Sequence, residues 1–222
     1  MNKLNHVAFI MDGNGRWGKK RNKGRNFGHL EGIKTVKKIV KSSIKLDIPI
    51  ITFYVFSSEN WKRPKKEINF LFKLIKNYFL QEIENIIVQG IKINIFGDMK
   101  KLPADISSTL RETIKLTKKN KKIVVNLAIN YGSHDEILNA FKQNKKKINK
   151  TNIENNLYSK NIQNPDILIR TGGHQRLSNF MLWQLAYAEL FFLKKLWPDF
   201  TSFDLLKIVK KYKKSIRNFG NI

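Results

Sequence analysis

The chain has 222 residues, 41% of them apolar and 11% aromatic, which is the composition of a globular protein. Its 43 Lys and Arg outnumber its 17 Asp and Glu and give a formal net charge of +26. The absence of Cys excludes disulfides, thiolate metal sites and cysteine nucleophiles, and no apolar run approaches the ~20 residues of a membrane-spanning helix. With no signal peptide before the first strand and no linker-like segment, we expect a cytoplasmic protein with one domain over residues 1–222.

Six apolar, β-branched runs alternate along the chain with longer segments of helical periodicity. The predicted strands are residues 6–10, 50–56, 91–96, 123–129, 166–169 and 190–193. The predicted helices are residues 29–46, 65–88, 104–117, 135–147, a short one capped by Thr151, 180–188 with Glu189 at its end, and a last one from about residue 203. This alternation predicts an α/β fold: a single, mostly parallel, six-stranded sheet flanked by helices, with ligands at the carboxyl ends of the strands.

The net charge alone is typical of a protein that binds nucleic acid or an anionic membrane. Most of the cations are lysines, however, and the lysine-rich runs at 118–122 and 145–147 contain no aromatic residues. Single-stranded nucleic-acid sites interleave aromatic side chains with the cations, so that bases can stack. We therefore expect a solvated lysine-rich surface and no nucleic-acid partner. A basic nucleic-acid or anionic-membrane binding α/β domain is the alternative function.

The apolar residues of the predicted helix at 65–88 cover more than one stripe of its surface. A helix of this kind buries two faces. Either both faces pack in the core, or one of them lines an apolar ligand cavity. The sequence favours neither.

The stretch that follows the first strand places Asp12 directly before a loop with three glycines in six positions and several cations. Gly13 to Gly18 match G-x-G-x-x-G, but Arg16 and Trp17 crowd the turn where a dinucleotide-binding helix begins on small residues. An aspartate at this place also repels pyrophosphate unless a divalent cation lies between them. We therefore interpret Asp12, Mg²⁺ and nearby arginines as a diphosphate site in which the metal neutralises a leaving group.

The arginines support this interpretation, because six of the eight in the chain fall in three loops at strand ends. Lysine replaces arginine well as a point charge, but not where a planar fork must hold two oxygens at once. Parallel strands would bring the three loops to one edge of the sheet, and a polyanion-binding surface would instead spread arginines along an outer face. The residues are Arg16, Arg21, Arg25, Arg63, Arg170 and Arg176.

Five motifs together resemble the signatures of cis-prenyltransferases, most closely bacterial undecaprenyl diphosphate synthase. They are His-Val-Ala-Phe-Ile-Met-Asp-Gly-Asn-Gly-Arg-Trp at 6–17, Phe-Gly-His at 27–29, Phe-Ser-Ser-Glu-Asn-Trp at 56–61, Ile-Arg-Thr-Gly-Gly at 169–173 and Leu-Trp-Gln-Leu-Ala-Tyr-Ala-Glu at 182–189. The resemblance implies successive cis additions of isopentenyl diphosphate to an allylic diphosphate such as farnesyl diphosphate. It also implies Mg²⁺, an undecaprenyl product for a cell-wall lipid carrier, an apolar tunnel and a homodimer. From the lysine-rich surface we expect a peripheral contact with anionic lipid at the inner face of the membrane.

The resemblance assigns roles to matching positions. It makes Asp12 and Asn60 catalytic, and Asp12 and Glu189 metal ligands. An amide is a poor base, so we interpret Asn60 as a positioning group, with released diphosphate as the proton acceptor. The implied substrate contacts are Gly13, Asn14, Gly15, Arg16, Trp17, Arg25, His29, Ser57, Ser58, Glu59, Trp61, Arg63, Arg170, Arg176, Leu177 and Ser178.

Some of these residues have simpler structural interpretations. Trp17 and Trp61 could be core aromatics, His29 a hydrogen-bonding residue at a helix start, and Glu189 the end of a helix. Asp12 among glycines at a strand end has no comparable structural role. A non-catalytic family member acting as a subunit of a hetero-complex is expected to lack Asp12 and Asn60, and both are present.

The chain also departs from the family pattern. Gln175 stands where the family has a metal-ligating histidine, which leaves the second metal site open, and Ser133 and His134 replace a Gly-Arg pair. Asn218 stands where the family has an arginine that reaches the partner subunit, for which Arg217 is the candidate substitute. The chain length of the product depends on the depth of the tunnel, which the sequence does not give.

Overall fold

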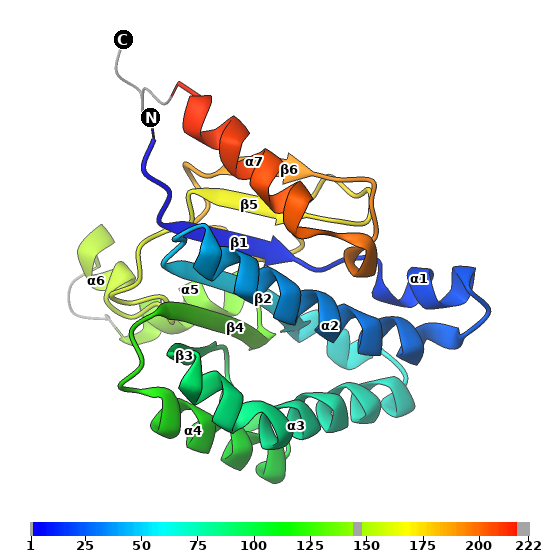
Figure 1. Cartoon of the computed structure of the whole chain (residues 1–222). Helices are drawn as coiled ribbons and strands as arrows, with labels where there is room; N and C mark the ends of the chain where they lie inside the picture. Colours follow the sequence, from blue (N-terminus) through cyan, green and yellow to red (C-terminus); the bar gives the residue numbers. More distant parts are fainter. Residues whose placement is uncertain (1, 144–147, 217–222) are drawn as a thin grey trace.

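The computed structural model describes residues 2–143 and 148–216, and its strands form one six-stranded sheet (Figure 1). The order is β3–β4–β2–β1–β5–β6, and every neighbouring pair is parallel. The strands are β1 His6–Ile10, β2 Ile50–Ser57, β3 Ile91–Phe96, β4 Ile123–Tyr131, β5 Ile167–Arg170 and β6 Glu189–Phe192. The predicted fold class and all six predicted strands are confirmed, and the sheet is wholly parallel.

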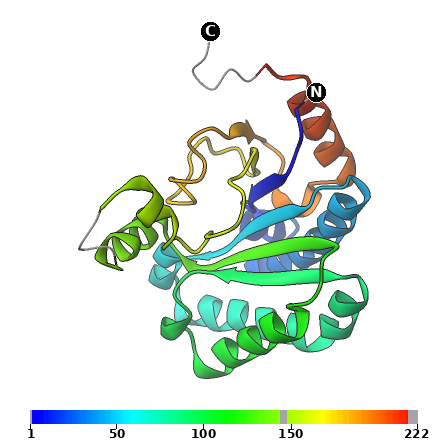
Figure 2. The same cartoon turned by 90° about the vertical axis from the view of Figure 1, so that its left-hand side faces the viewer.

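Helices cover both faces of this sheet. Figure 2 shows α5 and α6 on one side of it and α2 and α7 on the other. The helices are α1 Asn14–Lys20, α2 Gly24–Lys45, α3 Lys65–Val88, α4 Ala104–Thr117, α5 Ser133–Gln143, α6 Lys150–Glu154 and α7 Ser202–Lys214, with short 3₁₀ turns η1 Ser58–Lys62, η2 Met99–Lys101 and η3 Trp197–Asp199.

The two faces of the sheet bury side chains in alternation, as β1 illustrates. Val7 and Phe9 belong to the large core under α2, α3, α4 and α7. Ala8 and Ile10 belong to a smaller core on the opposite face, which includes Phe180 and residues near it. Strands buried on both faces read as continuous apolar runs, which is why the sequence identified them.

The stretch after Asp12 was predicted to be a loop, and this is wrong. It forms α1, and α2 begins at Gly24 rather than at residue 29. The two helices lie so close that a Cβ at Gly28 would be 1.8 Å from the Asn14 carbonyl oxygen, and one at Gly18 would be 1.9 Å from the Gly24 carbonyl oxygen. The glycines that indicated a loop are therefore the contact points of two packed helices.

The predicted helix at 180–188 is also wrong, since this segment folds as successive turns. Ser178, Asn179 and Met181 have φ angles of 51°, 61° and 47°, in the left-handed region that interrupts any α-helix. Phe180 and Met181 are nevertheless fully buried. The run is apolar because it packs in the core, and burial gives the same composition to a helix and to a compact loop.

A smaller correction concerns the start of α6. Thr151 lies inside this helix, and Asn149 caps it by accepting a hydrogen bond of 2.9 Å from the Asn152 N–H. The helix predicted at 135–147 forms α5, Ser133–Gln143, and its residues 144–147 lie outside the described residues. Residues 65–88 and 104–117 form α3 and α4 with the predicted bounds.

A row of buried polar side chains crosses the sheet near the amino end of β1. His6 Nδ1 lies 2.6 Å from the Gln163 carbonyl oxygen, and His6 Nε2 lies 2.6 Å from Thr52 Oγ1. Asn126 donates to Thr52 Oγ1 at 2.9 Å, and Asn94 donates to Asn126 at 3.0 Å. Burial lowers the pKa of His6 to about 4, although the Gln163 carbonyl opposes the shift, so the ring is neutral at neutral pH.

Candidate active site

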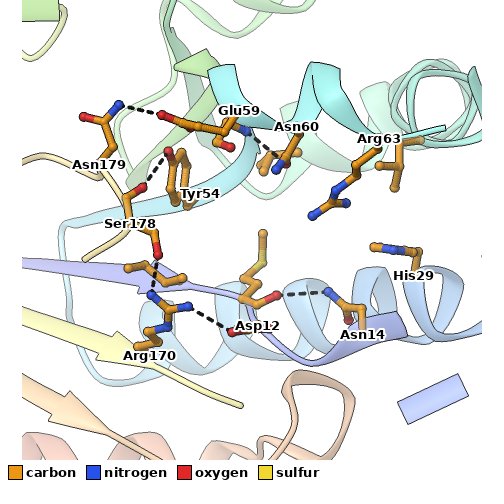
Figure 3. Close-up of a pocket in the computed structure, with 15 residues that line it drawn as sticks. Asp12, Asn14, His29, Tyr54, Glu59, Asn60, Arg63, Arg170, Ser178 and Asn179 are labelled. Atoms are coloured by element: carbon orange, nitrogen blue, oxygen red, sulfur yellow. Dashed lines mark hydrogen bonds and ion pairs between the residues drawn. The ribbon is translucent and has the colours of Figure 1, made fainter. Parts of the chain in front are cut away.

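A cavity of about 560 Å³ lies at the carboxyl ends of β1, β2 and β5 (Figure 3). The central position of β1, between β2 and β5, brings the three loops that follow these strands together. The prediction that chain-distant arginine loops share one edge of the sheet is confirmed for Arg63 and Arg170. The lining residues are Ile10, Met11, Asp12, Asn14, His29, Tyr54, Val55, Ser57, Glu59, Asn60, Arg63, Leu71, Arg170, Ser178 and Asn179.

The Asp12 carboxylate is held between two guanidinium groups. Oδ1 accepts from Arg16 Nη2 and Oδ2 accepts from Arg170 Nη2, each at 3.0 Å. Burial alone would raise the pKa of Asp12, but the hydrogen bonds from Arg170 and Arg16 outweigh it and the pKa falls below its usual range. The carboxylate is therefore charged at neutral pH and faces the cavity.

The approach of the Asp12 and Arg16 side chains depends on Gly172, in the loop after β5. A Cβ at this position would lie 2.5 Å from Arg16 Nη2 and 3.0 Å from Asp12 Cγ. Its φ of +90° is also one that side chains rarely adopt. The glycine after β5 thus leaves room for the carboxylate and its partner at the end of β1.

Arg170 is almost fully buried, with 4% of its surface exposed, and it connects β5 to the loop that follows. Its Nη1 donates to Ser178 Oγ at 2.8 Å and also to the Arg176 carbonyl oxygen. Tyr54 donates from its hydroxyl to the Ser178 carbonyl oxygen at 3.2 Å. The loop is thereby fixed against β2, with Ser178 on the wall of the cavity.

The segment after β2 forms the 3₁₀ turn η1 on the other wall. Asn60 Oδ1 accepts from the Ser57 N–H at 3.2 Å and so caps this turn. Glu59 Oε1 accepts from Asn179 Nδ2 at 2.8 Å, which links η1 to the loop after β5. Burial tends to raise the pKa of Glu59, but the hydrogen bonds that it accepts, first the one from Asn179, make the net shift downward. Glu59 is thus a second charged carboxylate on the cavity wall.

A second group of cations surrounds Glu67, in the first turn of α3. Arg25 forms a two-pronged pair with it at 2.9 and 3.1 Å, Arg63 lies 3.4 Å away, and His29 Nε2 lies 3.8 Å away. Burial and the charge of Arg63 lower the pKa of His29 to about 4 against the opposing effect of Glu67. Arg63 and the neutral His29 line the cavity, and Glu67 links Arg25 to them.

The two predicted tryptophans do not line the cavity. Trp61 donates to Asn130 Oδ1 at 2.7 Å and packs on Phe56 and Phe72. Trp17 donates to Asp199 Oδ1 at 2.6 Å, and the guanidinium of Arg21 lies 3.7 Å from the centre of one of its rings. In this structure both indoles hold neighbouring elements together.

The other predicted residues are distributed as follows. Arg16 contacts Asp12, and Arg25 contacts Glu67. A Cβ at Gly15 would lie 2.8 Å from Arg25 Cζ, so this glycine makes room for the arginine. Nine predicted residues line the cavity: Asp12, Asn14, His29, Ser57, Glu59, Asn60, Arg63, Arg170 and Ser178. Gly13, Ser58, Arg176 and Leu177 flank them in the chain without lining it. Arg217 and Asn218 lie outside the described residues.

The structure does not bring Glu189 to Asp12. Glu189 is the first residue of β6 and pairs with Ile167, at the amino end of β5. The cavity lies beyond the other end of these strands, where Phe192 pairs with Arg170. Among the described residues, no cluster of three or more His, Cys, Asp or Glu side chains could hold a metal ion.

Sequence reasoning missed two wall residues, Tyr54 and Val55, which are neighbours in β2 and both line the cavity. Adjacent strand residues normally point to opposite faces. Tyr54 packs against the smaller core and Val55 against the large core on the other face, so the cavity extends around the carboxyl end of β2 to both faces. Glu67 was also missed, although its place in the first turn of a predicted helix, soon after Arg63, was visible in the sequence.

Comparisons with known proteins identify the class. The model of a family described as "Putative undecaprenyl diphosphate synthase" matches residues 10–220. A protein of Treponema denticola named isoprenyl transferase is 45% identical, with 98% of both chains covered. Lavandulyl diphosphate synthase of Lavandula x intermedia, solved in complex with dimethylallyl diphosphate, superimposes with a TM-score of 0.93 at 32% identity and 98% coverage of both chains.

Two further similarities agree. The isoprenyl transferase of Clostridium tetani is 42% identical over 98% of this chain and 89% of its own. The structure of a probable undecaprenyl diphosphate synthase of Campylobacter jejuni gives a TM-score of 0.86 at 32% identity, with both chains fully covered. The family model and these relatives together show that the chain is a prenyltransferase. The chain belongs to the isoprenyl transferase family, as its motifs predicted.

None of the helices in the described part of the chain is long and apolar enough to cross a membrane.

Proposed function

We propose that this isoprenyl transferase adds isopentenyl diphosphate units in cis to an allylic diphosphate primer such as farnesyl diphosphate. The observation that carries the proposal is the joint placement of Asp12, Arg170 and Arg63 on one cavity whose floor includes Ile10, Met11 and Leu71. Cations suit the diphosphate, and apolar side chains suit the hydrocarbon. The relative solved with dimethylallyl diphosphate supports an allylic substrate.

The two groups of cations suggest two diphosphate positions. Arg16, in the first helix turn after Asp12, would hold the allylic diphosphate together with the Arg25 and Arg63 group around Glu67. The buried Arg170, with Ser178 and the exposed Arg176, would hold isopentenyl diphosphate. Both diphosphates would replace carboxylates that now occupy the guanidinium forks, Glu67 in the first case and Asp12 in the second.

The residues present fit a Mg²⁺ ion held chiefly by substrate. In such sites Mg²⁺ is bound through one or two carboxylates and the substrate phosphates, with water completing the shell. Asp12 supplies a charged carboxylate at the cavity, and Glu59 is the other carboxylate in its lining. When bound, Mg²⁺ would neutralise the diphosphate leaving group. Since Glu189 lies at the amino end of β6, at the opposite end of the strands from the cavity, we assign no metal role to it within this chain.

Asn60 is proposed to orient the isopentenyl group rather than to remove its proton. Its carbonyl oxygen already accepts the Ser57 N–H, which fixes the amide at the cavity wall. His29 lines the same cavity, and its imidazole is unprotonated at neutral pH because its pKa is lowered to about 4. So low a pKa makes it a weak base, and released diphosphate remains the proposed acceptor.

A second cavity, of about 250 Å³, lies further along α2 and α3 above β3 and β4, and its walls are mostly apolar. Leu71 lines the first cavity and Phe79 the second, and the two lie two turns apart on α3. We propose that the growing chain extends in this direction. Both sequence interpretations of α3 then hold, because Phe72 and Phe79 are also buried in the core.

The wider biological assignment is likewise a proposal. We propose an undecaprenyl product that serves as a lipid carrier for the cell wall, made by a cytoplasmic homodimer. The surplus of 43 basic over 17 acidic residues supports a peripheral contact with anionic lipid, at which a long-chain product would leave. An unchanged release rate in the presence of anionic vesicles would contradict this contact.

The test is an incubation of the purified protein with labelled isopentenyl diphosphate, farnesyl diphosphate and Mg²⁺. We expect labelled long-chain polyprenyl diphosphate, and at least a ~100-fold loss of rate in Asp12→Ala, as for other electrostatic groups at reacting centres. Asp105→Ala is the matched control, since this exposed aspartate pairs with Lys76 on α3, remote from the cavity. No long-chain product from the unmodified protein would refute the proposal.

A further inference from the structure

One ion pair joins α2 to α3 beside the second cavity. Lys37 Nζ of α2 lies 2.5 Å from Glu82 Oε1 of α3, and both residues line the cavity. The Lys37 ammonium also lies 5.3 Å from the centre of the Tyr78 ring. The two side chains are partly exposed, at 37% and 23%.

The acidic side of this pair is held in place along α3. Asn85 donates to Oε2 of Glu82, the carboxylate oxygen that does not contact Lys37, at 3.0 Å. Gln89 in turn donates to Asn85 at 2.6 Å. The hydrogen bonds from Lys37 and Asn85 keep the pKa of Glu82 below its usual range, so the carboxylate is charged at neutral pH. Lys37 is thus the α2 partner of a hydrogen-bonded polar row that forms the outer wall of the cavity.

The inner wall is of the opposite character. It consists of sheet residues, Ile91 and Ile93 from β3 and Val125 and Leu127 from β4. A cavity with an apolar floor and a polar rim suits a hydrocarbon rather than a polar ligand. With a volume of about 250 Å³, it limits the length of chain that fits while α2 and α3 keep their present separation.

Within the described chain, ion pairs join α2 and α3 at two places. The first is Arg25 with Glu67 at the diphosphate end. The second is Lys37 with Glu82, which lies twelve residues further along α2, or about 18 Å at the rise of an α-helix. A hydrocarbon that extends from the first cavity therefore has to lie between helices that are fastened at both positions.

We propose that the Lys37–Glu82 pair determines product length by holding α2 against α3 over the second cavity. This inference rests on the proposed chain elongation. Each added prenyl unit beyond the capacity of the cavity must separate the two helices and strain the pair. Elongation then competes with release of the product. The strength of the pair determines the chain length at which release becomes faster than elongation. Ion pairs of this exposure correspond to about a 1.4- to fivefold bias, enough to shift a distribution of chain lengths.

The test uses Lys37→Met and Glu82→Gln, which remove one charge each and keep most of the side-chain volume. We expect the ratio of longer to shorter products to rise about 1.4- to fivefold in both variants, measured with labelled isopentenyl diphosphate and chromatography of the products. The double exchange of Lys37→Glu with Glu82→Lys restores the pair and should restore the original distribution. Lys76→Met is the matched control, since Lys76 pairs with Asp105 at 2.8 Å between α3 and α4 and lines neither cavity.

A binding measurement tests the role of the Lys37–Glu82 pair independently of the proposed reaction. Calorimetry with dodecyl and eicosyl diphosphate, which are saturated and do not react, should show a gain in affinity for the longer chain only in the Lys37 and Glu82 variants. If the protein makes no polyprenyl product but this gain appears, the proposed function fails and the role of the pair stands. Folded variants with unchanged product lengths and unchanged chain-length preference would overturn the inference.

Discussion

Asp12 and Arg170 are 158 positions apart in the sequence, and their side chains form an ion pair of 3.0 Å on the wall of the cavity. Arg170 is nearly inaccessible to water, and Asp12 is the more exposed partner. The pair joins the carboxyl ends of β1 and β5, which are adjacent in the sheet. It therefore supports both the local fold and the electrostatics of the site, and substitution of Arg170 should affect both.

Arg170→Ala is expected to lower the free energy of unfolding by about 2 kcal/mol or more, because it leaves Asp12 and Ser178 without their buried partner. It should also lower kcat/KM by about 100-fold or more, through the loss of a preorganised cation. Arg176→Gln is the control for stability, because its exposed side chain is outside the cavity and only its main-chain carbonyl contacts Arg170. Denaturant unfolding and steady-state kinetics measure the two effects, and an Arg170→Ala protein of unchanged stability would contradict the structural part.

Ser178 offers a test that separates a hydrogen bond from backbone strain. Ser178→Ala removes the oxygen that accepts from Arg170 at 2.8 Å and should cost about 1–2 kcal/mol. Ser178→Gly removes the same oxygen but relieves a left-handed φ of 51°, which costs a residue with a Cβ about 1 kcal/mol. We therefore expect the glycine variant to be the more stable of the two in urea unfolding. The reverse order would show that the backbone at this position is not strained.

The contact between α1 and α2 depends on the lack of a side chain at Gly28. Since a Cβ there would lie 1.8 Å from the Asn14 carbonyl oxygen, Gly28→Ala must displace α1, at a cost of about 1–3 kcal/mol or more. Asn14 lines the cavity, so catalytic efficiency should fall with stability. Asn26→Ala, two residues earlier and exposed, is the matched control and should stay within about 0.5 kcal/mol of the unmodified protein. Equal thermal stability of the two variants would contradict the packing argument.

The outcome at these positions shows which features a sequence conveys. Strands buried on both faces were predicted because a mostly apolar run such as 6–10 has few alternatives at that length. The helix α1 was missed because Gly15 and Gly18 indicate a loop locally, while their use is to let α2 approach, which is a tertiary contact. The segment around Phe180 was misread for the opposite reason, since its apolar composition reflects burial and not helical periodicity.

The site was predicted to a similar extent. Asp12 and Arg170 could be identified because charged groups at strand ends have few structural uses. Tyr54 and Val55 could not, since they lie on opposite faces of β2 and both line the cavity only because it extends around the end of the strand. Glu189 was assigned to the site by its motif alone, and the parallel pairing of β6 with β5 places it at the opposite end of the strands from the cavity.

The two buried histidines should make the protein less stable in mild acid. The folded-state pKa values of His6 and His29 are lowered to about 4, mainly by burial, whereas the unfolded chain has values near 6.5. Their contribution to stability is therefore complete above pH 6.5 and is lost as the pH falls from 6.5 toward 4, because the unfolded state binds the protons first. Each histidine contributes a slope of up to about 1.4 kcal/mol per pH unit in this window. The carboxylates of the site have lowered pKa values and act only below about pH 4.5, so the range from pH 6.5 to 5 isolates the histidines.

Urea unfolding at pH 7, 6 and 5 measures this slope directly. His29→Asn should remove about half of it, because His6 remains buried against Thr52 and the Gln163 carbonyl. NMR of the imidazole carbons provides an independent reading, in which both rings stay neutral at pH 5 in the folded protein. A midpoint near 6.5 for His6 would mean that its ring accepts a proton inside the sheet, and the row of hydrogen bonds through Thr52 and Asn126 would then have to rearrange.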